Sequence, residues 1–296
     1  MSGKPTALTR AELQKHPLPA SQAEDKDDRG RILVVAGCKE VPGAALLSGL
    51  AAMRTGAGKL QIVTSSGAAT ALGVSMPEAR IVAVAEGRDG GIARSAVGAI
   101  GAVARDVDAV VAGPGLAPGK ANWRLAAALC DANAPLVLDA ELLRVLPECR
   151  ELVAAAVEPI LLPHEGELAA LLGCSEAQVE RDPLAAGRQC ARRYAALTLV
   201  KGRRSHVVMP DGRAWLYTGG SPGLAVSGSG DVLAGIVGGL RARGADALTA
   251  LLWGVWLHGE AGSKLGKACG HVGFLARELP GEIPSILAAQ DSARPR

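Results

Sequence analysis

The chain has 296 residues and a mass of 30.0 kDa, enough for one large domain with a substantial core. Its net charge is +3 with Lys and Arg dispersed, and only 2% of its residues are aromatic, which excludes a basic nucleic-acid surface and base-stacking platforms. Six scattered cysteines without metal-ligand spacing indicate reduced thiols in a cytoplasmic protein, and no apolar run is long enough to cross a membrane.

The chain begins with a polar arm over residues 1–28, which contains three prolines and an acidic cluster. A short helix is expected within the arm, around residues 10–15. No internal linker interrupts the pattern that follows, so we expect one domain over residues 29–290 and a flexible tail over 291–296.

From residue 31, short apolar runs alternate with stretches of helical periodicity. Strands are expected at 32–36, 60–64, 81–84, 109–112, 136–139, 160–162 and 197–201, and helices at 43–55, 92–105 and 122–132. Continuous apolar strands separated by helices are typical of a parallel sheet covered on both faces. The pattern then changes: residues 206–209 and 214–217 flank an Asp-Gly turn and predict an antiparallel hairpin. Helices are expected at 230–243 and 245–265.

Glycines and polar residues are concentrated where these strands end. They are residues 37–43, 113–115, 139, 164–167 and 201–202. Ligands of open α/β sheets bind outside the carboxyl ends of the strands, so a single site spanning these loops is the simplest interpretation.

The loop at residues 228–231, Gly-Ser-Gly-Asp, leads directly into a helix of small apolar residues. A glycine-rich loop at a helix N-terminus offers free N–H groups and a positive dipole end to phosphate. A carboxylate in that place repels phosphate, which a purely anion-binding loop would not favour. Asp231 could instead take a proton from a hydroxyl that attacks a phosphoryl group.

Each feature also has a purely structural alternative. Asp231 could only cap its helix, His164 and Glu167 could only start a helix after Pro163, and Asp139 could only end a strand. The turn at residues 113–115 and the Lys201–Gly202 pair could be turns without a ligand. The Gly-Ala-Gly-Lys run at residues 56–59 lacks the other residues of a P-loop.

Several short sequence motifs occur together along the chain. They are residues 220–235, with Gly-Ser-Gly-Asp-Val-Leu at their centre, Pro-His-Glu-Gly-Glu at 163–167, Gly-Pro-Gly-Leu at 113–116, Val-Leu-Asp-Ala at 137–140, Lys-Gly-Arg-Arg-Ser at 201–205, Arg-Thr-Gly-Ala-Gly at 54–58 and His-Gly at 258–259. Jointly they resemble the NAD(P)H-hydrate dehydratase family of the ribokinase-like superfamily, from about residue 29 to about residue 279.

The resemblance implies an α/β fold with three α/β/α layers, a mainly parallel central sheet and a C-terminal β-hairpin. It implies an enzyme that restores hydrated NADH or NADPH by phosphorylating the ring hydroxyl, with ADP or ATP as co-substrate. Relatives often form tetramers, so a homo-oligomer is expected.

The resemblance also assigns residues. Asp231 would be the catalytic base, with the amides of Gly228, Ser229 and Gly230 stabilising the transferred phosphoryl group. The hydrated dinucleotide would contact Ala44, Gly115, His164 and Asp231. The adenine nucleotide would contact Lys201, Gly202, Arg203, Arg204, Ser205 and Gly230. Glu167 would help to organise Mg²⁺ through water.

The chain departs from the family pattern at a few positions. Ser221 replaces an Asn, Val226 and Leu224 are altered in the same loop, and Arg144 stands where an Asn contact is usual. Two alternatives therefore stay open: a ribokinase-like kinase of a vitamin precursor or sugar, and a non-catalytic nucleotide-binding relative.

Overall fold

The computed structural model describes residues 3–19, 25–88 and 90–291. The expected tail at 291–296 therefore lies outside the described residues, apart from its first position. The strands are β1 (Thr6–Ala7), β2 (Arg31–Val35), β3 (Lys59–Ser65), β4 (Ala79–Val84), β5 (Ala109–Ala112), β6 (Leu136–Leu138), β7 (Ile160–Leu161), β8 (Leu197–Val200), β9 (Ser205–Val208) and β10 (Ala214–Tyr217).

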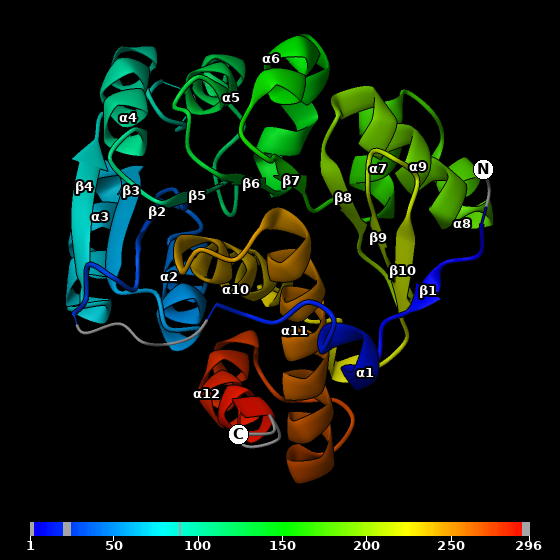
Figure 1. Cartoon of the computed structure of the whole chain (residues 1–296). Coiled ribbons are helices and arrows are strands. Elements are labelled where there is room, and N and C mark those ends of the chain that lie inside the picture. Colours follow the sequence, from blue (N-terminus) through cyan, green and yellow to red (C-terminus); the bar gives the residue numbers. More distant parts are fainter. Residues whose placement is uncertain (1–2, 20–24, 89, 292–296) are drawn as a thin grey trace.

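These strands form one sheet in the order β1-β10-β9-β8-β7-β6-β5-β2-β3-β4 (Figure 1). The seven strands from β2 to β8 run parallel to one another. β9 is antiparallel to both β8 and β10 and turns back at Asp211-Gly212. The order reverses between β2 and β5, which is where a doubly wound sheet opens a crevice at its carboxyl edge.

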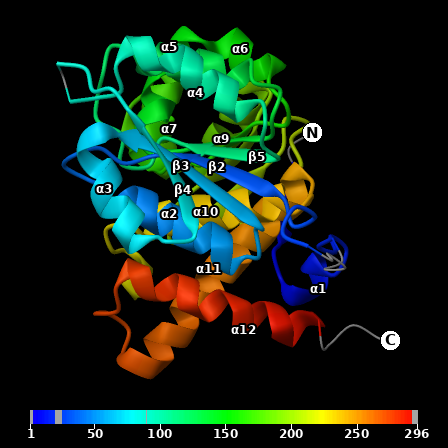
Figure 2. The same ribbon diagram turned by 90° about the vertical axis from the view of Figure 1, so that its left-hand side faces the viewer.

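Helices cover both faces of the sheet (Figure 2). One face is covered by α2 (Gly43–Arg54), α3 (Ser66–Ser75), α10 (Ser229–Ala242) and α11 (Ala247–Cys269), with α12 (Leu279–Asp291) packed outside α2 and α11. The other is covered by α4 (Val97–Ala104), α5 (Asn122–Cys130), α6 (Arg150–Ala155), α7 (Glu165–Leu172), α8 (Glu176–Arg181) and α9 (Pro183–Tyr194).

Successive residues of a strand point to opposite faces of the sheet. In β2, Ile32 and Val34 pack into the core on one face, and Leu33 and Val35 pack into the core on the other. The three-layer, mainly parallel fold class is thereby confirmed.

The structure differs from the expected elements in places. The arm contributes the edge strand β1, which pairs with β10, before the short helix α1 (Arg10–Leu13). The helix expected at 92–105 is shorter: a bridge between Glu86 and Ile92 keeps its first residues extended, and a 3₁₀ turn precedes α4. No helix was expected specifically at 183–194, although Asp182 caps α9 and Pro183 occupies its first position.

Close packing of α10 against α2 places the glycine-rich loop. A β-carbon at Gly235 would collide with the Ser48 backbone, and one at Gly239 with Thr55 and Ala52. These glycines therefore let the two helix backbones approach. Among the helices that the structure describes, none is long and apolar enough to span a bilayer.

Candidate active site

Helix α10 begins at the carboxyl edge of the sheet with Gly228 as its N-cap. Gly228 adopts φ +87°, and no side chain among the described residues caps the helix. The Ser229 N–H donates to the Val226 carbonyl (3.2 Å), so of the three expected amides only those of Gly228 and Gly230 remain free. These free donors and the positive end of a 14-residue helix make a site for an anion. Asp231 lies in the first turn of the helix, as expected, and its carbonyl accepts a hydrogen bond of 2.9 Å from Ser48 Oγ on α2.

Beside this helix start, Lys201 lies among acidic side chains. Its Nζ is 2.6 Å from Asp139 Oδ1 and 3.7 Å from Glu167 Oε2. A methyl group added at Gly230 would lie 3.6 Å from Lys201 Nζ and 3.9 Å from Asp139 Oδ2. Three strand ends and α10 thus bring their functional groups to one place.

The electrostatics of this cluster set the protonation of two groups. Burial, reinforced by the negative charge of Asp139 and opposed by Lys201, raises the pKa of Asp231 to about 6. Burial disfavours the Lys201 ammonium, but Asp139 and Glu167 outweigh it and hold the pKa of Lys201 above its ordinary value. Asp231 is therefore a base matched to neutral pH, facing a lysine that stays charged.

His164 and Glu167 form a capping box at the start of α7. The His164 Nδ1 accepts hydrogen bonds from the N–H groups of Gly166 (3.0 Å) and Glu167 (3.3 Å). In return, Glu167 Oε2 accepts one of 2.9 Å from the His164 N–H. The structural alternative for this pair is thus realised. The proton of the exposed His164 ring is then on Nε2, which lies 3.5 Å from Glu167 Oε1 and could also donate to a ligand.

The expected substrate residues Ala44 and Gly115 touch each other. A β-carbon at Gly115 would collide with that of Ala44, and one at Gly113 with the Asp139 carbonyl. Gly113 and Gly115 both adopt positive φ, so this turn requires glycine whether or not a ligand binds. The turn joins the Asp139 strand end to the start of α2. Ala44 itself is buried.

The remaining expected nucleotide contacts lie in an exposed turn after β8. The Ser205 hydroxyl donates to the Gly202 carbonyl (3.1 Å). Arg203 and Arg204 are exposed, and among the described residues neither forms an ion pair with the acidic cluster. Lys201 thus lies inside the acidic cluster, whereas Gly202, Arg203 and Arg204 after it are exposed.

Three neighbours of the site were missed as site residues. Asp139 was considered only as a strand end, although its position after an apolar strand is the signal that could have found it. Ser48 gave no signal. His258 belongs to the His-Gly phrase and contacts Ser229, with its Nε2 2.9 Å from the Ser229 Oγ.

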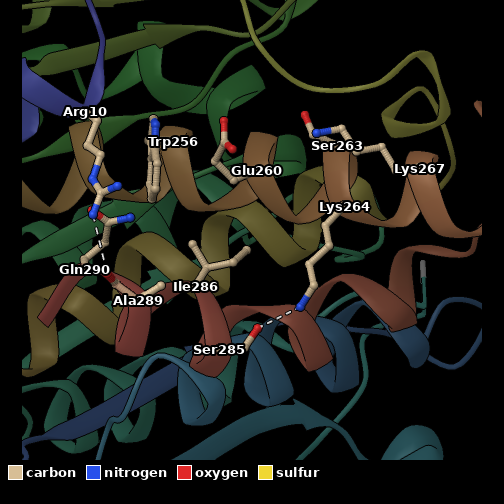
Figure 3. Close-up of a pocket in the computed structure, with 10 residues that line it drawn as sticks. All are labelled: Arg10, Trp256, Glu260, Ser263, Lys264, Lys267, Ser285, Ile286, Ala289 and Gln290. Carbon is tan, nitrogen blue, oxygen red and sulfur yellow. Dashed lines mark hydrogen bonds between the residues drawn. The ribbon is translucent and has the colours of Figure 1, made fainter. Parts of the chain in front are cut away.

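A cavity of about 640 Å³ lies elsewhere, between α11 and α12 (Figure 3). Its lining residues on α11 are Trp256, Glu260, Ser263, Lys264 and Lys267. At 100° per residue these side chains centre on the side of α11 opposite His258. The cavity is therefore separate from the cluster around Asp231.

Comparison with known proteins finds one family along most of the chain. Residues 32–285 match the family model described as NAD(P)H-hydrate dehydratase. The chain is 45% identical over 281 residues to the ADP-dependent (S)-NAD(P)H-hydrate dehydratase of Xanthomonas campestris, covering 95% of each. It spans about half the length of the bifunctional NAD(P)H-hydrate repair enzymes that it also matches.

Two solved structures share the fold. The ADP/ATP-dependent NAD(P)H-hydrate dehydratase of Bacillus subtilis, co-crystallised with ATP and Mg²⁺, superposes with a TM-score of 0.80 at 26% identity, over 96% of this chain and 98% of that one. A ribokinase-like superfamily protein of Enterococcus faecalis gives 0.82 at 21% identity, over 96% of each chain, which supports the fold alone.

Proposed function

The chain belongs to the NAD(P)H-hydrate dehydratase family, and on that basis we propose that it restores hydrated NADH or NADPH at the expense of ADP or ATP. The observation that carries this proposal is Asp231, a buried carboxylate with its pKa raised to about 6 at the start of the anion-binding helix α10. A site that only binds an anion does not need a base. Phosphorylation of a hydroxyl does, because the hydroxyl proton must be removed.

The proposed reaction balances as follows. Asp231 accepts the proton of the ring hydroxyl, whose oxygen forms a bond to the terminal phosphorus of ADP while the bond to AMP breaks. The ring carbon–oxygen bond then breaks with help from the ring nitrogen lone pair, and phosphate leaves in place of hydroxide. Loss of a ring proton restores the double bond, so the sum is hydrated NADH plus ADP to NADH, AMP and phosphate.

The other protein groups would bind and orient the two nucleotides. The free N–H groups of Gly228 and Gly230 and the Lys201 ammonium would stabilise charge on the transferred phosphoryl group. The Nε2–H of His164 and the backbone around Ala44 and Gly115 would contact the hydrated dinucleotide. Residues 202–205 would contact the adenine nucleotide from the rim.

The donor set fits a magnesium ion carried on the nucleotide phosphates. Asp139, Glu167 and Asp231 oppose one lysine, so the site is acidic and would repel phosphates that arrived without a cation. Within the described residues, no group of three His, Cys, Asp or Glu side chains is arranged as an all-protein cage. Magnesium commonly binds through one or two carboxylates, waters and phosphates, and Glu167 would reach it through water. When bound, the ion neutralises charge on the phosphates.

We further propose a homo-oligomer, a tetramer by the family resemblance, acting in the cytoplasm. Light scattering on the purified chain tests the oligomeric state. A mass of one chain would contradict it.

The function is tested by incubating the purified chain with verified hydrated NADH, Mg²⁺, and either ADP or ATP. We expect the absorbance of reduced nicotinamide to grow with one of the nucleotides. If neither nucleotide supports conversion, the proposal fails. Consumption of ATP with simple alcohols, and accumulation of phosphorylated products, would instead indicate a small-molecule kinase.

A further inference from the structure

The first residue of α10 is joined to α11 by a buried histidine. The His258 Nε2 lies 2.9 Å from the Ser229 hydroxyl oxygen and 3.1 Å from the Ser229 carbonyl oxygen. Ser229 is only 6% exposed. Burial lowers the pKa of His258 to about 4 against the opposing effect of the Ser229 carbonyl, so the ring is neutral at physiological pH.

The two contacts decide which nitrogen carries the proton. A carbonyl oxygen has no proton to give, so its contact requires a proton on Nε2. That N–H donates to the Ser229 carbonyl and hydroxyl oxygens together, and His258 cannot then act as a base toward Ser229. A serine nucleophile activated by histidine is therefore excluded at this position.

The same arrangement leaves the hydroxyl proton of Ser229 available. Its oxygen already accepts from His258, and the part of the chain that the structure describes offers no acceptor for its own proton. Ser229 occupies the first position of α10, next to Gly228 and Gly230 at the free N–H groups. An anion held there meets the hydroxyl as a further donor.

Building on the proposed function, we propose that His258 is a positioning residue that holds the Ser229 hydroxyl as a hydrogen-bond donor to a nucleotide phosphate at the head of α10. A hydrogen bond to a charged group contributes more than one between neutral groups. His258 would thus act through Ser229, from the face of α11 opposite the cavity of Figure 3.

The test is a double-mutant cycle on the affinity for Mg-ADP, measured by calorimetry on the full chain. We expect Ser229→Ala and His258→Ala each to weaken binding about tenfold, and the double variant to lose about tenfold rather than a hundredfold. His258→Gln keeps an N–H near the same place and should bind close to wild type. Ser263→Ala, which removes a hydroxyl from the other face of α11, serves as the matched control and should change nothing.

The outcomes separate the two proposals. Additive losses, a His258→Gln variant as weak as His258→Ala, or a Ser229→Ala variant with wild-type affinity would overturn the positioning role. If His258→Ala fails to fold, His258→Gln and Ser229→Ala still decide the matter. A wild-type chain that binds Mg-ADP but does not convert hydrated NADH with either nucleotide would contradict the proposed function alone. A chain that binds neither Mg-ADP nor Mg-ATP would overturn both.

Discussion

The proton affinity of Asp231 results from two opposing neighbours. Burial and the charge of Asp139 favour the protonated carboxyl, and Lys201 favours the carboxylate. Lys201 lies closer to Asp139, at 2.6 Å, so the two partly neutralise each other and burial dominates. A substitution at Asp139 should therefore change the pKa of Asp231, although Asp231 itself is unaltered.

We expect Asp139→Asn to move the acid limb of the kcat/KM profile to lower pH. The wild-type rate should rise through an apparent pKa near 6, because the carboxylate of Asp231 is the active form. Loss of the Asp139 charge lowers the pKa of Asp231, by roughly one unit. The exposed Asp131→Asn is the control. An unmoved limb, or one at higher pH, would contradict this account.

Ionised Asp231 should also lower the stability of the folded protein at neutral pH. Its folded pKa of about 6 lies above its ordinary value of 3.8, so the stability it contributes is present below pH 4 and lost as the pH rises through 6. The gain in the free energy of unfolding from Asp231→Asn should therefore be larger at pH 7.5 than at pH 4.5, by about 1–2 kcal/mol. Urea unfolding at both pH values measures this, and equal effects at the two would refute it.

At the scale of single elements, local signals predicted much of what the structure shows. The apolar strands, the Asp211-Gly212 turn and the start of α10 follow from residues adjacent in sequence. The Lys201–Asp139 pair joins residues 62 apart, and the His258–Ser229 contact residues 29 apart. Such pairs depend on which strands and helices become neighbours, and no local pattern encodes that.

The cap of α7 allows its structural and binding roles to be separated. His164→Ala should destabilise the chain by about 1 kcal/mol, because two N–H groups lose their acceptor. His164→Asn provides another good cap and should restore most of that loss, as measured by thermal unfolding. If His164 also contacts the hydrated dinucleotide, the KM for it stays raised in both variants. A KM restored together with stability would leave His164 a cap only.

At the scale of the molecule, the arm packs against the domain. Leu8 and Leu13 are buried, and the indole N–H groups of Trp215 and Trp253 donate to Glu12 Oε1 (3.1 Å) and the His16 carbonyl (2.7 Å). The polar composition of the arm concealed this role, since few apolar side chains carry it and the β1–β10 pairing and the His16 contact use backbone groups.

We propose that residues 29–290 nevertheless fold as one domain. A chain starting at Arg29 should fold, with a free energy of unfolding lower by about 3–6 kcal/mol for the two leucines and the lost indole partners. Calorimetric melting compares it with the full chain. Equal melting temperatures would show that the arm does not pack, and failure to fold would contradict the domain boundary.

The most direct test of Asp231 as the base follows AMP and reduced nicotinamide together, with hydrated NADH and Mg-ADP, in the wild type and in Asp231→Asn. We expect the wild type to form AMP and NADH in equal amounts. Asp231→Asn should be slower by about 10²–10⁴-fold while binding Mg-ADP no more weakly than the wild type. A variant that converts the hydrate at the wild-type rate, or AMP formed without NADH in the wild type, would contradict the account.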